Sequence, residues 1–297
     1  MGNVLVGITS WTEPSLVASG RFYPSSADTA ENRLKFYSSK FPIVEVDSSY
    51  YSMPNEGTAN LWVARTPDKF IFDIKAFRLF TQHQTSPTGL PKDIREALPP
   101  EIKTKEKIYY SDVPYVLKKE LWQRFAQAIL PLKMAGKLGI VLFQFAPWFT
   151  PGDKEKEYIA YCQKMLPQYR LAIEFRNALW TNQDNLEQTF KFLKERNLAY
   201  VCCDEPQGFK SSVPFIAEAT SDIGVVRFHG RNKEAWDKAG LTAAERFNYL
   251  YSEKELKEFV PKIKDLSLKT QQLHVLFNNC YGDKAVINAS QVKVMVS

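Results

Sequence analysis

Short apolar runs, rich in Val, Ile and Phe, recur along the whole chain, and most of them end in a cluster of polar residues. Buried strands of a parallel sheet have this near-continuous apolar character, so each run is a strand candidate. The eight candidates are residues 4–10, 43–48, 70–75, 139–145, 171–176, 199–204, 225–229 and 273–278.

The segments between these runs carry apolar residues three or four positions apart, the spacing of one helix face. Clear examples are Leu34, Tyr37 and Phe41; Trp122, Phe125, Ile129 and Leu132; Leu186, Phe190 and Leu193; and Leu256, Phe259, Ile263 and Leu266. Eight strands that alternate with helices, without an evident domain boundary, predict one α/β domain over residues 1–297. We expect a closed, parallel, TIM-barrel-like (β/α)₈ barrel. A doubly wound open sheet is the alternative, but no Gly-rich phosphate loop follows the first strand.

One segment interrupts the alternation. Residues 81–114, which follow the third strand, are rich in Pro and charge and have weak periodicity. Long irregular insertions are usually either functional lids or disordered excursions, and the sequence leaves both open for this one.

Alternation within each strand assigns side chains to the two faces of the barrel. In residues 171–176, Leu171, Ile173 and Phe175 face the helices, so Glu174 and Arg176 face the interior. The same rule predicts inward positions for Glu45, Asp47, Asp73, Lys75, Gln144, Asp204, Arg227, His229 and Asn278, and it places Arg231 on the same face as Arg227 and His229.

This set mixes cations with carboxylates, and an unpaired buried charge is very costly. The groups must therefore pair with one another, with water or with a ligand. Most of them end their strands, and barrel enzymes keep their chemistry at the carboxyl ends of the strands. Asp73, deeper in its strand than Lys75, is expected to be structural.

Composition adds three restrictions. A net charge of +6, from 39 Lys+Arg against 33 Asp+Glu, is dispersed, so nucleic-acid binding is not favoured, whereas a small anionic partner is compatible with it. No apolar run is long enough for a membrane span, and the N-terminus does not resemble a secretory signal. Four cysteines without metal-ligand or disulfide spacing suggest a reduced, cytoplasmic protein, and no cofactor is predicted.

Eight motifs in order give the chain a family resemblance: VGITSW, RFYP, VEVDSSYY, TPDKFIFDIKAF, LFQFAPWF, IEFRNALW, RFHGR and FNNCYGDKAVINA. Between Val6 and Ala289 the chain resembles the YecE-like family, catalogued as domain of unknown function DUF 72. The resemblance implies a TIM-barrel-like fold and no established activity. Family members commonly carry a second Gly before the Trp of the first motif, where this chain has Thr9 and Ser10 before Trp11.

The resemblance also implies a set of motif residues, most of which strand alternation selects independently. They are Ser10, Trp11, Tyr23, Glu45, Tyr51, Lys75, Gln144, Glu174, Arg176, Trp180, His229, Arg231, Asn278 and Asn279. Aromatic residues that follow strands could wall a pocket or serve only in packing; these are Trp11, Tyr23, Tyr50, Tyr51, Trp148 and Trp180.

The first functional hypothesis is a metal-independent acid/base enzyme for a small anionic, sugar- or phosphate-bearing substrate. Arg227, Arg231 and Arg176 are its expected anion clamp, since a guanidinium matches carboxylate and phosphate geometry. The expected catalytic groups are Glu174 or Glu45 as base, His229 as acid and Lys75 as oxyanion stabiliser or Schiff-base amine. An ion pair of Lys75 with Glu45 or Glu174 is the structural alternative. Trp11, Tyr51, Gln144, Trp180, Asn278 and Asn279 complete the expected substrate site.

Two other hypotheses compete with the first. A divalent-metal-dependent barrel enzyme of the isomerase or endonuclease type is one, with Glu174, Asp204 and His229 as ligands, although the neighbouring arginines would repel a cation. A non-catalytic binder of nucleic acid or protein is the other, based on the basic insertion residues Lys92, Arg95, Lys103, Lys105 and Lys107 and on the loop aromatics.

Overall fold

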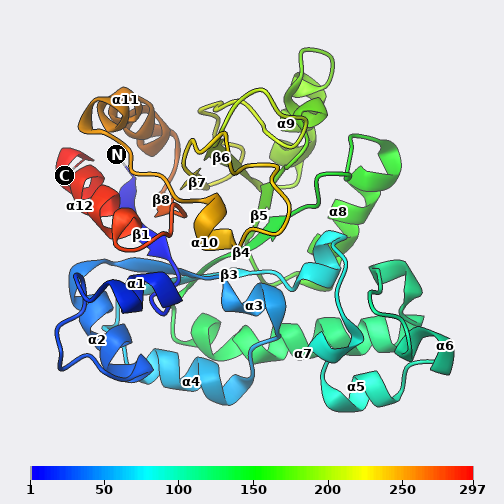
Figure 1. The fold of residues 1–297 in the computed structure, drawn as a ribbon. Helices are drawn as coiled ribbons and strands as arrows, with labels where there is room; N and C mark the ends of the chain where they lie inside the picture. Colours follow the sequence, from blue (N-terminus) through cyan, green and yellow to red (C-terminus); the bar gives the residue numbers. More distant parts are fainter. Residues whose placement is uncertain (1, 297) are drawn as a thin grey trace.

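A computed structural model describes residues 2–296 and contains a closed barrel of eight parallel strands in sequence order (Figure 1). This confirms the predicted (β/α)₈ architecture. The strands are β1 (Asn3–Thr9), β2 (Ile43–Val46), β3 (Ile71–Lys75), β4 (Leu138–Gln144), β5 (Leu171–Glu174), β6 (Ala199–Asp204), β7 (Ile223–Phe228) and β8 (Gln272–Phe277). β8 pairs with β1 over six residues and so closes the barrel.

Helices surround the strands and connect most of them. They are α1 (Pro14–Ser19), α2 (Ala30–Lys40), α3 (Ser48–Tyr51), α4 (Glu56–Ala64), α5 (Lys92–Glu96), α6 (Pro100–Lys103), α7 (Tyr115–Met134), α8 (Asp153–Met165), α9 (Leu186–Glu195), α10 (Ala243–Arg246), α11 (Glu253–Lys269) and α12 (Lys284–Val296). Residues 205–222 link β6 to β7 without a helix. No helix within residues 2–296 is both long and apolar enough to cross a bilayer.

Local sequence explains where α11 begins and which face it buries. Ser252 caps the start of α11: its side chain accepts from the Glu255 amide, while the Glu255 carboxylate accepts from the Ser252 amide. Leu256, Phe259 and Ile263 are buried at the spacing expected from the sequence. The helix therefore packs its apolar face on the outside of the barrel.

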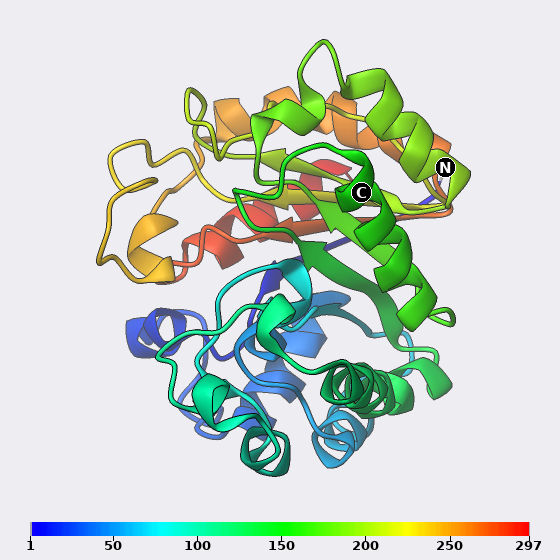
Figure 2. The ribbon, with the colours of Figure 1, turned by 90° about the vertical axis from the view of Figure 1, so that its right-hand side faces the viewer.

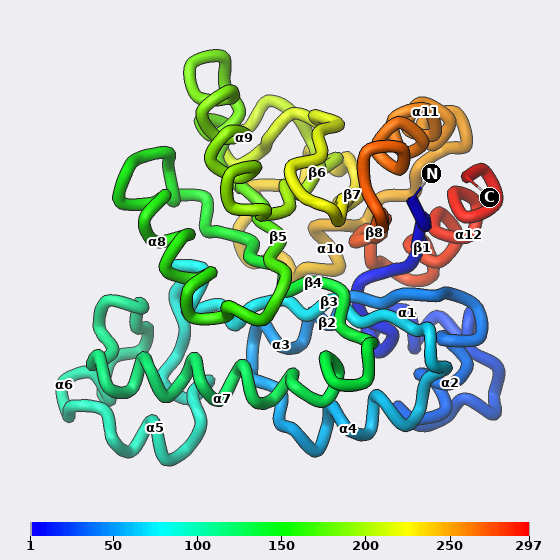
Figure 3. The backbone as a smooth tube through the Cα atoms, turned by 180° about the vertical axis from the view of Figure 1, so that it is seen from behind, coloured from blue at the N-terminus to red at the C-terminus, as the bar shows by residue number. Residues whose placement is uncertain are grey.

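The insertion after β3 is ordered, and its helices α5 and α6 lie beside the barrel. Leu90, Ile94 and Leu98 are buried in the main hydrophobic core, and the Arg124 guanidinium on α7 pairs with Asp93 on α5. Figure 3 shows α5 and α6 along the outer end of α7, away from the strands. A disordered excursion is therefore the wrong expectation, and α5 and α6 do not cover the barrel.

Asp73, which lies before the end of β3, makes contacts that serve the fold. Asp73 Oδ2 lies 2.8 Å from His274 Nδ1, and Asp73 Oδ1 accepts from the Ile140 amide at 3.0 Å. A Cβ at position 139 would lie 2.3 Å from Asp73 Oδ1, so the close packing of this pair requires Gly139. These contacts give Asp73 a structural function.

The carboxyl ends of the strands form the mouth of the barrel. The long segment between β7 and α11, which includes α10, projects beyond these ends on the side opposite the N-terminus (Figure 2). All four cysteines are free, and Cys162, Cys202 and Cys203 are buried.

Candidate functional site

Arg227 on β7 joins two carboxylates across the barrel interior. Its Nε and Nη2 donate to the two oxygens of Glu45 on β2 at 2.9 and 2.7 Å, and its Nη1 donates to Glu174 Oε2 on β5. All three side chains are fully buried. We call Glu45, Glu174, Arg227 and His229 the inner charged cluster.

Glu174 accepts hydrogen bonds from four side chains. Besides Arg227, these are Gln144 Nε2 at 2.6 Å, His229 Nε2 at 3.0 Å and Arg176 Nη1 at 3.3 Å. Burial by itself raises the pKa of this carboxyl, but the charge of Arg227 and the bonds from its neighbours hold the pKa well below its ordinary value. Glu174 is therefore an ionised and saturated acceptor.

His229 is fixed as a neutral ring by its neighbours. Thr9 Oγ1 donates to Asn278 Oδ1 at 2.7 Å, which turns the Asn278 amide nitrogen toward His229 Nδ1 at 2.9 Å. Nδ1 is then the acceptor, and Nε2 carries the hydrogen that it donates to Glu174. Burial outweighs the nearby carboxylate and lowers the pKa of His229 to about 3.

Two other buried carboxyl groups have pKa values near neutrality. Burial raises the pKa of Glu45 to about 7 against the opposing charge of Arg227. Burial also raises the pKa of Glu205, in the connection after β6, to about 7, although Arg176 opposes this effect. Glu205 Oε2 lies 3.0 Å from Arg176 Nη1, and Oε1 accepts from the Val213 amide at 2.6 Å.

Lys75 and Asp47 form an ion pair nearer the solvent. Lys75 Nζ lies 2.8 Å from Asp47 Oδ1, and the two side chains are 9% and 26% exposed. Burial disfavours the ammonium, but Asp47 and Glu45 keep the pKa of Lys75 above its ordinary value. The Lys75 ammonium also lies 4.7 Å from the centre of the Tyr50 ring. The expected ion pair of Lys75 thus exists, but its direct partner is Asp47.

The segment between β7 and α11 covers the inner charged cluster. The Phe247 ring centre lies 5.5 Å from that of His229, and the Trp236 ring centre lies 6.4 Å from it. The Arg176 guanidinium also lies over the Trp236 ring, 4.6 Å from the ring centre. This segment, which the sequence did not single out, occupies the position expected of a lid.

Two expected inward positions are wrong. Asp204 pairs in register with Phe228, whose ring packs on α11, while Cys203 pairs with Arg227 and faces inward. Asp204 instead accepts from Tyr251 Oη at 2.6 Å and from Arg231 Nε at 2.9 Å. Arg231 therefore belongs to the outer side of the barrel and cannot join Arg227 in an anion clamp.

Three other expected substrate contacts are packing residues. The Trp11 ring meets Trp62 edge to face at 5.8 Å, outside the barrel. Trp180 is fully buried, stacks on Phe175 at 4.2 Å and donates to the Phe149 carbonyl. The amide nitrogen of Asn279 donates to Tyr249 O and Asn288 Oδ1. Of the expected aromatic wall, Tyr51 and Trp148 are exposed at the mouth, by 53% and 55%.

The residues do not fit a metal ion well. Ligand atoms of Glu174, Cys203 and His229 lie within 4.8 Å of one another, so a cation site is geometrically conceivable. However, Arg227 Nη1 bonds Glu174 and lies 3.4 Å from His229 Nε2, which puts a positive charge among the ligands. Burial also raises the pKa of Cys203, so its thiol keeps the proton that a metal must displace. With Asp204 outside, the expected ligand set is not assembled.

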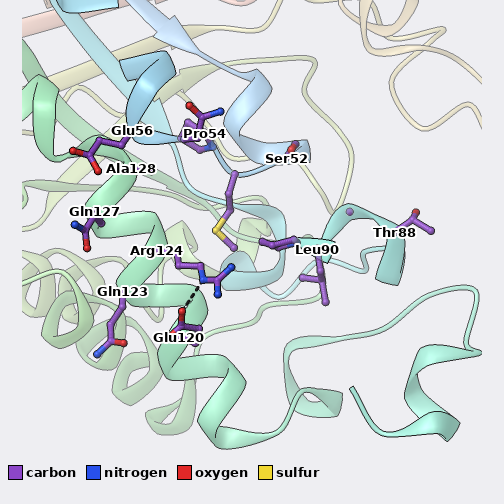
Figure 4. Close-up of a pocket in the computed structure, with 14 residues that line it drawn as sticks. Ser52, Pro54, Glu56, Thr88, Leu90, Glu120, Gln123, Arg124, Gln127 and Ala128 are labelled. Atoms are coloured by element: carbon purple, nitrogen blue, oxygen red, sulfur yellow. Dashed lines mark hydrogen bonds and ion pairs between the residues drawn. The ribbon is translucent and has the colours of Figure 1, made fainter. Parts of the chain in front are cut away.

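A cavity of about 820 Å³ lies away from this chemistry, on the outer surface (Figure 4). It is bounded by residues 52–56, residues 88–91 and α7. Arg124, which lines the cavity, already donates from Nε to Glu120 Oε1 at 2.6 Å and pairs with Asp93. No member of the inner charged cluster lines this cavity, so we place the candidate site at the mouth.

Comparisons with known proteins agree with the fold and leave the activity open. The family model described as "Protein of unknown function DUF72" matches residues 5–297. The UPF0759 protein YunF of Bacillus subtilis (strain 168) is 32% identical over 293 residues, which are 97% of this chain and 93% of that protein.

Two solved structures of DUF72 family proteins are similar over almost the whole chain. The protein from Thermotoga maritima MSB8 is 30% identical, with 99% of each chain covered and a TM-score of 0.77. The protein from Enterococcus faecalis V583 is 26% identical, with 99% of this chain and 95% of that chain covered and a TM-score of 0.77. The chain therefore belongs to the DUF72 family of proteins of unknown function.

Proposed function

We propose that this chain is a metal-independent acid/base enzyme that acts on a small anionic, sugar- or phosphate-bearing substrate at the mouth of the barrel. The observation that supports this most is the partly exposed Lys75–Asp47 ion pair, with an Nζ–Oδ1 distance of 2.8 Å, in front of a buried charged cluster. An acid and a base side by side at the carboxyl ends of barrel strands can move a proton on a bound molecule.

Lys75 and Asp47 take the reacting roles in this proposal. The raised pKa of Lys75 keeps it an ammonium, which suits stabilisation of a developing oxyanion and disfavours Schiff-base formation. Asp47 is the more exposed carboxylate and acts as the base. It removes a proton from the carbon next to a carbonyl group, the electron pair moves to the carbonyl oxygen beside Lys75, and the proton later returns.

Glu45, Glu174 and His229 act as positioning groups. Glu45 and Asp47 follow one another on the inner face at the end of β2, and Glu174 is the acceptor that fixes Gln144 and Arg176. Because these groups are fully buried behind the ion pair, a substrate in the mouth would meet Lys75, Asp47, Gln144 and Arg176 first. The fixed charges behind them hold the reacting groups in place without solvent rearrangement.

The nucleic-acid alternative has less support. Two lysines of the insertion are partly neutralised, since Lys105 pairs with Asp112 at 2.8 Å and Lys92 approaches Glu96 at 3.9 Å. Lys103 donates to the Glu96 carbonyl. A stripe of free cations, which a nucleic-acid backbone requires, is not formed by these three residues.

Solvent exchange measured by proton NMR tests the proposed activity. The protein is incubated in D₂O and EDTA with a panel of keto sugar acids and ketose phosphates, and loss of the proton next to the carbonyl is followed. Wild type should catalyse exchange on at least one compound, and Lys75→Gln should slow it by at least about a hundredfold, as for loss of one group that stabilises a developing oxyanion.

Lys75→Arg is the matched control for charge, because it keeps a cation beside Asp47. If oxyanion stabilisation is the role of Lys75, this variant should retain more activity than Lys75→Gln. Exchange that disappears with EDTA and returns with Zn²⁺ or Mn²⁺ would contradict the metal-independent mechanism. Absence of exchange across the whole panel would contradict proton abstraction.

A further inference from the structure

Among the residues that the structure describes, Arg78 is a cation at the mouth without a carboxylate partner. It begins the 3₁₀ turn of residues 78–81, three positions after the last residue of β3, and its guanidinium lies 5.2 Å from the Tyr50 ring centre and 6.0 Å from that of Tyr51. Within residues 2–296 it forms no ion pair, and its buried Nε has no hydrogen-bond partner. A partly buried guanidinium of this kind is incomplete unless an anion or water satisfies it.

The other cations of this region are already compensated. Lys75 pairs with Asp47, Arg176 pairs with Glu174 and Glu205, and Arg227 pairs with Glu45 and Glu174. The expected anion clamp of Arg227 and Arg231 is therefore not available to a ligand. Arg78 lies beside the Lys75–Asp47 pair, since Lys75 and Arg78 both lie against the Tyr50 ring. Within the described part of the chain, its positive charge has no carboxylate partner.

His83 presents a hydrogen-bond acceptor next to Arg78. The backbone amide of His83 donates to the Arg78 carbonyl at 3.1 Å, and its ring lies edge to face with Tyr50 at 5.4 Å and Trp148 at 5.8 Å. Thr81 Oγ1 donates to the Arg78 carbonyl at 3.0 Å, so its oxygen accepts from His83 Nδ1 at 2.9 Å. In the neutral ring, Nε2 is then left as an acceptor.

We propose that Arg78 and His83 form the subsite that binds a hydroxylated anion, with the guanidinium on a carboxylate or phosphate and His83 Nε2 accepting from a hydroxyl of the same molecule. The inference rests on the proposed function, because it names the substrate class of the same mouth. Exposed faces of Tyr51 and Trp148 flank the subsite, where the C–H face of a sugar ring can pack. Sugar acids and sugar phosphates combine these features.

Protonation does not disturb the acceptor over the ordinary pH range. Burial and the charges of Lys75, Arg78 and Arg176 lower the pKa of His83 to about 3. The ring therefore stays neutral from pH 5 to pH 8, and its contribution to binding should not change across this window.

Calorimetric titration tests the subsite with gluconate, glucose 6-phosphate, glucose and acetate. Wild type should bind at least one of the two sugar anions more tightly than glucose or acetate. Arg78→Gln should weaken binding of that anion by about tenfold to a hundredfold, the change that one charge-assisted hydrogen-bonded pair supports. The preference between gluconate and glucose 6-phosphate distinguishes a carboxylate site from a phosphate site.

His83→Phe separates the contributions of His83 and Arg78, and Arg196→Gln is the control. His83→Phe keeps an aromatic ring against Tyr50 and Trp148, so it should weaken sugar-anion binding but leave acetate binding unchanged. Arg196→Gln removes an exposed arginine just after α9, at the opposite end of the barrel, and should have no effect. Arg78→Lys, which keeps the charge, is the second variant if Arg78→Gln does not fold.

Several results would overturn the subsite. They are the absence of sugar-anion binding by wild type, equal binding by Arg78→Gln, and an equal loss in Arg196→Gln. Binding that depends on Arg78, together with no solvent exchange that depends on Lys75, would overturn the proposed enzyme but leave the subsite. The two proposals can therefore fail separately.

Discussion

Arg227 holds Glu45 through two parallel hydrogen bonds, at 2.9 and 2.7 Å, inside a barrel where neither side chain is exposed to solvent. A guanidinium and a carboxylate meet here in their best bidentate geometry. The remaining Nη1 engages Glu174, so one cation compensates two carboxylates. The inner charged cluster therefore depends on Arg227.

Replacing Arg227 should destabilise the fold strongly. In Arg227→Met, two buried carboxylates lose their cation, and removal of one partner from a buried pair costs about 3–5 kcal/mol. Urea denaturation at pH 7 measures the change. Arg124→Met is the matched control, since Arg124 pairs with Asp93 and Glu120 at a surface where such pairs contribute about 0–1 kcal/mol. Equal losses in the two variants would contradict the central position of Arg227.

Glu205 should make stability depend on pH between about 4.5 and 7. Its pKa is raised from 4.5 to about 7 by burial, so the unfolded chain releases the proton before the folded protein does. Stability contributed by the protonated carboxyl is present below pH 4.5 and is lost as the pH rises through 7.

Glu205→Gln removes this titration. As the pH rises from 4 to 8, the free energy of unfolding of the variant should increase relative to that of wild type by up to about 3 kcal/mol, at about 1.4 kcal/mol per pKa unit. Denaturation curves of both proteins at several pH values measure this difference. The titration of Glu45 does not affect the difference, because both proteins contain Glu45. If the free energies of unfolding of the two proteins changed with pH in the same way, Glu205 would be ionised throughout this pH range, and the prediction would be wrong.

Ser10 should be replaceable by glycine with a gain in stability. Its φ of 60° lies in the left-handed region, which costs a residue with a Cβ about 1–2 kcal/mol. Ser10→Gly should therefore stabilise the protein by about 0.5–1 kcal/mol after the loss of a weak bond to the Thr12 amide at 3.4 Å. Ser10→Ala keeps the strain and should give no gain in thermal denaturation; a gain there would refute this account.

The segment between β7 and α11 should control access to His229. Phe247→Ala removes a ring from the cover, and an aromatic pair contributes about 0.5–1.5 kcal/mol. Modification of His229 by diethyl pyrocarbonate should then accelerate about twofold to tenfold, as measured by peptide mass spectrometry. His274, buried against Asp73 inside the barrel, is the internal control. An unchanged rate at His229 would mean that Phe247 does not limit access.

Strand alternation predicted most of the interior because the outer faces are consistently apolar. Phe143 stacks on Trp122 and Phe175 on Trp180, which leaves Gln144 and Glu174 inside and bonded to each other. The pattern needs only an apolar helix layer outside each strand. For this reason Glu45, Lys75 and His229 also lie where the sequence placed them.

Alternation failed where the outer face is polar or the strand has ended. Asp204 accepts hydrogen bonds from Tyr251 and Arg231 on the outer side of β6. Its charge is compensated there, so the side chain does not need to face the barrel interior. β7 ends at Phe228, and Gly230 has a φ of 85°, which turns the chain before Arg231. The alternation of side chains between the two faces of a strand does not continue beyond such a turn.

Arg78 and His83 could not be found by this rule either. They lie in and directly after a 3₁₀ turn, whose side-chain directions follow neither the strand nor the α-helix period. The available signal is a cation three positions after the last residue of β3. Trp236 and Phe247 belong to a long segment with one short helix, and only tertiary contacts place them over His229.

A crystal structure of the protein grown with gluconate or glucose 6-phosphate tests the central claim most directly. We predict density for the ligand in the mouth, with its anionic group within hydrogen-bond distance of Arg78 and its body next to Lys75 and Trp148. Density confined to the outer cavity between residues 52–56 and α7, with an unoccupied mouth at saturating ligand, would contradict the account.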